Sequence, residues 1–321
     1  MGVQSAIYEI IRETLQNCDT SLSVKELCEI AGVSRSGYYN WINSEATRIV
    51  KEAQDQKDFE LILEAYNYRG YKKGVLSINM RLLHMGVVMN PKKIRRLMRK
   101  YHLFCPIRQA NPYRRMAKAL RTNNVASNLL NREFEAHGAR KVLLTDITYI
   151  KFQDCFLYLS TILDAYTKEA LAHVLCDNLE IDFVLQTVKN LQRDFGVSLQ
   201  TETIIHSDQG CHYTSVKFIT LVQDIGLRQS MSRRGNCWDN APQESFYGHM
   251  KDELADKMAE WDTFESAKHD IDDWFDYYNN DRYQWQLAKL SPSQFYNFVT
   301  TGEYPLPSMP PTQGVPRGSA P

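Results

Sequence analysis

Three acidic residues stand out by their positions in the chain. Asp146 lies inside an apolar run, Asp208 directly follows another apolar run, and Glu244 comes shortly after the polar segment 233–240. Three carboxylates that lie close together repel each other strongly unless protons or divalent cations neutralise them. Oxygen ligands of this kind suit Mg²⁺ or Mn²⁺, which bind a few carboxylates together with waters or phosphate. If the fold brings these acids together, they could hold metal ions.

Such a site has a defined chemistry. Two ions about 3.5–4 Å apart stabilise both the attacking and the leaving oxygen of an in-line displacement at phosphorus. Taken singly, each acid could equally be a helix cap, a strand-end turn residue or a surface acid. The sequence therefore predicts a site for two Mg²⁺ ions, with Mn²⁺ as a substitute, on the condition that the three acids meet.

The elements that must position these acids are predicted to form an α/β fold. Apolar runs bounded by turn residues predict five strands, at 141–150, 156–164, 170–176, 203–207 and 227–231. The first three follow each other directly, as antiparallel strands do. The later ones are separated by segments with helical spacing.

Three helices complete this region. The first is amphipathic over 181–195, the second can be capped by Thr214, and the third begins near Ala241. The order βββαβαβα is that of a ribonuclease-H-like core, a five-stranded mixed sheet with flanking helices. In that fold the first and fourth strands are neighbours and the third helix packs across their edge. The fold therefore predicts that the three acids converge.

Residues 1–60 are predicted to contain a helix-turn-helix. Residues 24–31 have helical spacing, Gly32 interrupts it, and Ser34 can cap a second helix. Apolar residues fill the core positions of such a motif, namely Leu27, Ala31, Val33, Tyr38 and Trp41. We expect Arg35, at the start of the second helix, to contact DNA. Any two-helix packing unit is the alternative.

Residues 61–105 are predicted to form a second, basic helix-turn-helix-like unit. A helix over 76–84 ends near Gly86, and Asn90 can cap a next helix whose first residue is Pro91. That helix buries Ile94, Leu97 and Met98 and carries six cations, namely Lys92, Lys93, Arg95, Arg96, Arg99 and Lys100. We expect these cations to contact DNA phosphates, because each neutralised phosphate adds counterion-release free energy. A merely solvated basic face is the alternative.

The charge distribution agrees with a nucleic-acid-binding front. The whole chain has 38 Lys+Arg and 38 Asp+Glu, but residues 1–140 carry a net charge of +10 and residues 141–321 a net charge of −10. An odd number of cysteines, seven, with no C-x-x-C pair predicts a reducing, cytoplasmic setting. No apolar run approaches the roughly 18 residues that a membrane span needs, so we expect no membrane partner.

The remaining segments complete the predicted domain organisation. Residues 106–137 form a basic linker that could follow DNA, with Arg114 and Arg115 as contacts. The catalytic core covers 138–256, and a helical extension covers 257–303. The Pro-rich tail 304–321 is predicted to be disordered and contains VPRGS, which resembles an engineered protease-cleavage sequence.

Further DNA contacts are predicted around the third acid. The polar segment before Glu244 is expected to touch DNA near the scissile bond, through Arg233, Arg234 and Asn236. Trp238 either inserts beside a base or packs against the protein. Lys251 lies seven residues after Glu244, so two helical turns place both on one face, within reach of a phosphate. An ordinary surface lysine is the alternative.

The spacing of the acids and the residues around them resemble a known family. Sixty-one residues separate Asp146 from Asp208 and 35 separate Asp208 from Glu244. This is similar to the D,D(35)E arrangement of retroviral integrases and their bacterial relatives. Three longer motifs resemble the OrfB part of insertion-sequence transposases of the IS-three family: HSDQGCHYTS, SMSRRGNCWDNAPQESFYGHMKDEL and YNNDRYQWQLAKLSPSQF. The resemblance covers about residues 20–300.

The resemblance implies a Mg²⁺-dependent DNA transposase in which Asp146, Asp208 and Glu244 are the catalytic metal ligands. Water would nick the end of the element, and the freed 3′-hydroxyl would attack a second phosphodiester. The implied partners are double-stranded DNA, as terminal inverted repeats and as target, and further copies of the chain, at least a dimer. The implied location is the bacterial cytoplasm, in association with the nucleoid.

Some points stay open. The segment YNNDRYQWQLAKLSPSQF, residues 278–295, resembles the C-terminal element of the family, in which many relatives have His two residues after the Arg; this chain has Gln284 after Arg282. An upstream OrfA segment could be required. A DNA-binding repressor with a non-catalytic ribonuclease-H-like scaffold and a nuclease for RNA–DNA hybrids are alternative functions. A recombinase with Tyr213 or Tyr247 as nucleophile is disfavoured, because this sequence lacks the Arg/His set of that family.

Overall fold

The computed structural model describes residues 3–16, 22–106, 137–199, 202–232 and 241–307. The chain divides into two compact units, Met1–Leu63 and Glu64–Pro321, which we call the amino-terminal unit and the main unit. The boundary falls inside the long helix α4 (Glu45–Asn67). Within the described ranges, no helix is both long and apolar enough to cross a bilayer.

The amino-terminal unit contains the expected helix-turn-helix. α1 (Val3–Gln16) is followed by α2 (Val24–Ile30) and α3 (Arg35–Asn43). Ser23 caps α2, the side chain of Ser34 accepts a hydrogen bond from the main chain of α3, and Gly32 supplies the positive φ of +66° at the turn. Leu27, Tyr38 and Trp41 are buried as expected. The contribution of α1 to this core, through Ile11, was not predicted.

The main unit begins with the basic helices. A short 3₁₀ turn, η1 (Tyr68–Gly70), leads to α5 (Val75–His84) and α6 (Pro91–Lys100). The side chain of Asn90 accepts a hydrogen bond from the main-chain nitrogen of Lys92 at 2.8 Å, which caps α6. Ile94 and Leu97 are fully buried, and so is most of Met98, which confirms the buried side predicted for this helix.

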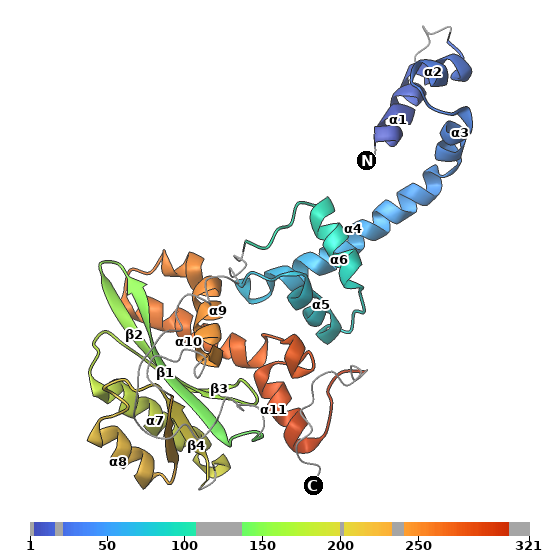
Figure 1. Cartoon of the computed structure of the whole chain (residues 1–321). Coiled ribbons are helices and arrows are strands. Elements are labelled where there is room, and N and C mark those ends of the chain that lie inside the picture. The colour runs from blue at the N-terminus through green and yellow to red at the C-terminus, as the bar shows by residue number, and fades with distance from the viewer. Residues whose placement is uncertain (1–2, 17–21, 107–136, 200–201, 233–240, 308–321) are drawn as a thin grey trace. The chain divides into compact units, whose positions relative to one another are not determined.

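A five-stranded mixed sheet forms the centre of the main unit (Figure 1). Its strands are β1 (Val142–Phe152), β2 (Cys155–Asp164), β3 (Ala170–Cys176), β4 (Ile204–Ser207) and β5 (Arg228–Met231). The strand order is β3-β2-β1-β4-β5, with antiparallel pairing among the first three strands and parallel pairing of β4 with β1 and β5. The predicted ribonuclease-H-like core is confirmed.

Helices cover both faces of this sheet. On one face lie α7 (Ile181–Phe195), which ends in the short turn η3 (Gly196–Ser198), and α8 (Val216–Asp224). On the other face lie α9 (Ala241–Met258) and α10 (Phe264–Asn280) (Figure 1). The alternation of strand side chains explains the two cores: Leu143 packs in the core of α7 and α8, whereas Ile150 packs in that of α9 and α10. The turn η5 (Trp285–Leu287) and α11 (Pro292–Thr301) complete the unit.

The cap of α8 differs from the prediction. Ser215, not Thr214, is the N-cap residue, and its hydroxyl accepts a hydrogen bond from the main-chain nitrogen of Phe218 at 3.2 Å. The Thr214 hydroxyl instead donates to the main-chain oxygen of Gly210 at 3.2 Å. Both residue types are good caps, so the sequence could not distinguish two adjacent positions.

Replacement of the two neighbouring hydroxyls tests this correction. Ser215→Ala should lower the free energy of unfolding by about 1 kcal/mol, because an orphan amide of the first helical turn loses its partner. Thr214→Ala is the matched control and should cost less. Urea denaturation of both variants is the measurement, and a larger loss for Thr214→Ala would contradict the assignment.

Candidate active site

Asp146, inside β1, and Asp208, directly after β4, lie on two neighbouring strands of the sheet. In the parallel pair of β1 and β4, Leu144 is in register with His206. Asp146 and Asp208 each come two residues after this pair. Both also act on Tyr213, which is 1% exposed: burial raises the pKa of its hydroxyl well above 10, and the charges of Asp146 and Asp208 raise it further. The two acids therefore lie around a common point.

Glu244 comes from α9, whose first turns are hydrogen-bonded to β1. The side-chain amide of Gln243 donates to the main-chain oxygen of Leu144 at 2.9 Å. The hydroxyl of Tyr247 lies 2.7 Å from the main-chain oxygen of Asp146 and 2.7 Å from the hydroxyl of Thr161 on β2. Glu244 lies between these two attachments in the sequence, so its turn of helix lies beside the part of β1 that carries Asp146.

The carboxylates themselves are turned toward local partners. One oxygen of Asp146 accepts a hydrogen bond from the main-chain nitrogen of Ile147, and one oxygen of Asp208 accepts from that of Gly210, both at 2.8 Å. Among the described residues, no three His, Cys, Asp or Glu side chains lie close enough to hold one metal ion. The main chain thus brings together three segments that carry acids, without a closed ligand shell.

The donors fit a hard divalent cation in their chemistry. All three are carboxylates, and Asp208 and Glu244 are exposed while Asp146 is half-buried. Carboxylate oxygens on an open surface leave room for waters and for a substrate phosphate, which Mg²⁺ requires.

Lys251 lies on α9, seven residues after Glu244. Its side chain is half-buried, which lowers the pKa of the amine, and the charge of Asp146 opposes this shift. The charge of Asp146 therefore acts on this amine, while the predicted phosphate contact of Lys251 stays a prediction.

The other predicted DNA contacts fall into two groups. Arg35 is exposed at the start of α3. On α6, Lys93 is half-buried and the other cations are exposed, namely Lys92, Arg95, Arg96, Arg99 and Lys100. The remaining contacts lie outside the described residues: Arg114 and Arg115 in the linker, and Arg233, Arg234, Asn236 and Trp238 before α9. Most of the linker 106–137 and the end of the tail 304–321 also lie outside them.

Sequence reasoning missed the residues that attach α9 to the sheet. Gln243 and Thr161 were not considered, and Tyr247 was considered only as a recombinase nucleophile. Its hydroxyl is buried, and burial raises its pKa well above 10, so it is poorly suited to attack phosphorus. The sequence shows only that Gln243 directly precedes the third acid, and its complete burial becomes visible in the structure alone.

The fold and the positions of the acids define a class of protein, the integrase-core enzymes that cut and join DNA strands. Models of the integrase core domain match residues 136–237 and 225–292, and the model of an HTH-like domain matches residues 53–111.

Bacterial proteins similar to this chain narrow the class to a family. The 31 kDa protein of insertion element IS600 from Shigella sonnei is 29% identical, over 84% of this chain and 97% of its own length. The transposase of insertion sequence IS904 from Lactococcus lactis is 30% identical, over 74% and 93%. Transposase InsF of IS3A from Escherichia coli is 25% identical, over 88% and 97%. The chain belongs to the IS-three family of insertion-sequence transposases, and it is a DNA transposase.

The attachment of α9 can be tested without any activity assay. Tyr247→Phe should lower the free energy of unfolding by about 1–3 kcal/mol, because a buried oxygen loses its hydrogen-bond partner. Tyr149→Phe, at a residue that is 51% exposed, is the matched control and should change stability little. Equal stability of Tyr247→Phe and wild type in urea denaturation would show that these hydrogen bonds do not hold the helix.

Proposed function

We propose that this transposase nicks the ends of its element and transfers the freed 3′-hydroxyl to a second phosphodiester, with Asp146, Asp208 and Glu244 as the ligands of two Mg²⁺ ions. Mn²⁺ would substitute. The observation that carries the proposal is the pair of attachments of α9 to β1 on either side of Glu244, next to the pair Leu144 and His206, two residues after which Asp146 and Asp208 follow.

The residues of the chain would divide the work as follows. Bound Mg²⁺ would lower the pKa of the attacking hydroxyl and offset charge on the leaving oxygen. Asp146 and Asp208 would hold the ions from the sheet and Glu244 from the helix. Lys251 would orient the phosphate that flanks the scissile bond. Gln243 and Tyr247 would keep the helix in place while the acids turn toward the ions.

DNA would be bound by several parts of the chain. The cations of α6 would contact phosphates of the terminal inverted repeat, and Arg35 would contact DNA from the amino-terminal unit. Arg114 and Arg115 would extend this contact, and the segment with Arg233, Arg234, Asn236 and Trp238 would touch DNA near the scissile bond. Lys251 would add a phosphate contact beside the acids.

The active form would contain at least two copies of the chain. Two element ends and one target must be held together for paired strand transfer, and one set of three acids acts on one strand at a time. The complex would assemble on chromosomal DNA, in the cytoplasm and on the nucleoid.

Loss of one carboxylate tests the catalytic proposal. In Mg²⁺ with labelled element-end DNA, Asp208→Asn should lower nicking and joining by more than about 100-fold, since even outer-shell partners of a metal cost 10–100-fold. DNA binding should persist. Asp224→Asn, an exposed acid at the end of α8, is the matched control and should stay active. Binding by wild type without metal-dependent nicking, in a chain that includes any upstream segment, would favour the repressor.

The salt dependence of DNA binding tests the role of α6. The double change Arg95→Gln with Arg96→Gln should weaken binding and lower the slope of log K against log salt by about 2, close to 0.9 for each lost phosphate contact. Mg²⁺ binding should be unchanged. Lys189→Gln, an exposed cation on α7, is the control. An unchanged slope in the double variant would contradict the contact.

A further inference from the structure

A buried ion pair holds α9 from the side away from the acids. Glu253 lies on α9, and Arg282 lies two residues after the end of α10. Nε and Nη2 of Arg282 each lie 2.9 Å from Oε1 of Glu253. The indole of Trp274 donates to Oε2 of the same carboxylate at 3.0 Å. The side chains of Arg282 and Glu253 are only 18% and 7% exposed, so the carboxylate is held by several buried donors at once.

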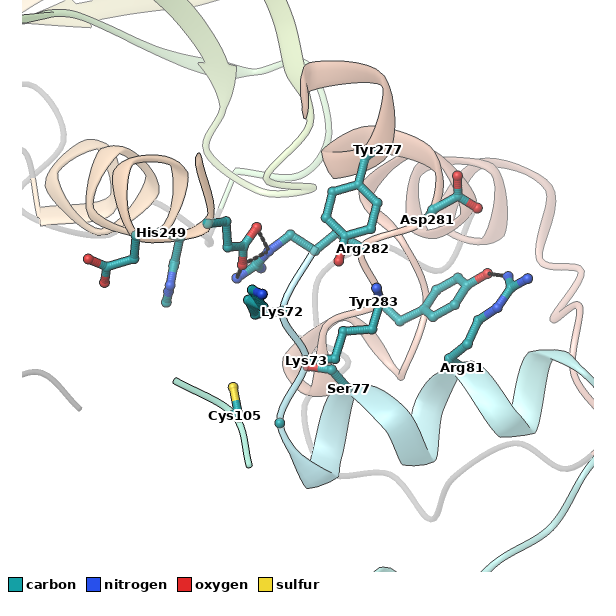
Figure 2. A pocket seen from close by; sticks show the side chains of 13 residues that line it. Lys72, Lys73, Ser77, Arg81, Cys105, His249, Tyr277, Asp281, Arg282 and Tyr283 are labelled. Atoms are coloured by element: carbon teal, nitrogen blue, oxygen red, sulfur yellow. Dashed lines mark hydrogen bonds and ion pairs between the residues drawn. The ribbon is translucent and has the colours of Figure 1, made fainter. Parts of the chain in front are cut away.

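This pair lies where three parts of the main unit meet. It lines a cavity of about 480 Å³, together with Lys72 from the segment before α5, His249 of α9 and Tyr277 of α10 (Figure 2). Arg282 thus belongs to the C-terminal element that follows α10 and reaches across to the helix that carries Glu244. It is the only residue of that element whose side chain is ion-paired with α9 in the described part of the chain.

The position of Glu253 around the helix axis determines how this contact acts on α9. Glu253 comes nine residues after Glu244, and at about 100° per residue the two side chains leave α9 on opposite sides. Gln243 and Tyr247 attach one side of the helix to β1, while Glu253 is held on another side. Attachments on two sides of a helix resist rotation about its axis, which an attachment on one side does not.

The free-energy balance of a buried ion pair favours a role in orientation over a role in stability. Burial of two charges costs desolvation free energy that their attraction roughly offsets, so an apolar pair of similar volume would often stabilise a fold as well or better. What the guanidinium adds over apolar packing is direction, because two of its rigidly spaced donors, Nε and Nη2, converge on Oε1 of Glu253, while Nε also lies 3.3 Å from Oε2.

We propose that Arg282 is a positioning residue for the third acid: through Glu253 it fixes the rotation of α9 and hence the direction of Glu244. The inference rests on the proposed role of Glu244. It also gives a function to the C-terminal element that does not depend on Gln284.

Arg282→Lys tests the proposal, because lysine keeps the charge and loses the pair of rigidly spaced donors. At a temperature well below the melting point, we expect kcat for nicking to fall by about 10–100-fold, the range seen when residues that orient metal ligands are changed. KM for element-end DNA should not change. In the protein without metal and DNA, amide hydrogen exchange in α9 should become faster.

Arg140→Lys is the matched control. Arg140 is also buried and ion-paired, with Glu169 at 2.7 Å and Asp164 at 3.5 Å, and it lies just before β1, outside the proposed catalytic and DNA-binding residues. Its replacement should lower the melting temperature and leave kcat and exchange in α9 unchanged. Equal effects of the two substitutions on kcat would overturn the proposal.

Two further variants make the outcomes distinguishable. If Arg282→Lys does not fold, Glu253→Gln serves in its place, since an amide keeps the volume and loses the ion pair, with the same expected results. Asp208→Asn is measured in the same assay. Joined products with Asp208→Asn would refute the proposed function, whereas an inactive Asp208→Asn with Arg282→Lys equal to Arg140→Lys would refute only the positioning role.

Discussion

The hydrogen bonds from α9 to the main chain of β1 are the constraint on which the arrangement of the site depends. β4 ends at Ser207 and pairs with β1 only as far as Leu144, whereas β1 continues to Phe152. Beyond Leu144, the edge of β1 that faces β4 is therefore not paired with β4. The attachments of α9 use the other edge, which faces β2: Val142 accepts there from the main-chain nitrogen of Ala165, and carbonyls two residues apart in a strand point to the same edge. Gln243 and Tyr247 donate to the main-chain oxygens of Leu144 and Asp146 on that edge.

The sequence predicted what depends on local pattern. The five strands follow from apolar runs, and the buried side of α6 follows from its spacing and from Asn90 and Pro91. The attachment of α9 could not be predicted, because Gln243 and Tyr247 bond residues 99 and 101 positions earlier. The N-cap of α8 could not be predicted either, because Ser215 and Thr214 both carry a hydroxyl and only the folded chain shows which one accepts a hydrogen bond from the helix. The prediction that the three acid-bearing segments meet depended on the fold topology. The directions of the carboxylates depend instead on local hydrogen bonds, such as the one that Asp208 accepts from Gly210.

The cations of the basic segment 1–140 have two roles that the sequence alone does not separate: some pair with acids of the main unit, and others stay exposed. Residues 1–140 carry a net charge of +10, which agrees with a nucleic-acid-binding front. In the structure part of that charge is neutralised within the main unit: Arg69 pairs with Asp276 at 2.6 Å and Lys72 with Asp256 at 3.3 Å. The cations of α6, in contrast, are largely exposed. Part of the basic segment thus docks on the acidic helices α9 and α10, and part remains turned outward.

A site built from mutually repelling acids needs a scaffold that stays in place when no cation is bound. Repulsion between the carboxylates favours any motion that separates the elements carrying them. Asp146 and Asp208 cannot separate far, because β1 and β4 are hydrogen-bonded strands of one sheet. Glu244 lies on a separate helix, so the attachments at Gln243, Tyr247 and Glu253 must resist that force. In the proposed site, the main chain of β1, β4 and α9 would thus stay fixed while the carboxylates turn from their present hydrogen bonds toward the ions.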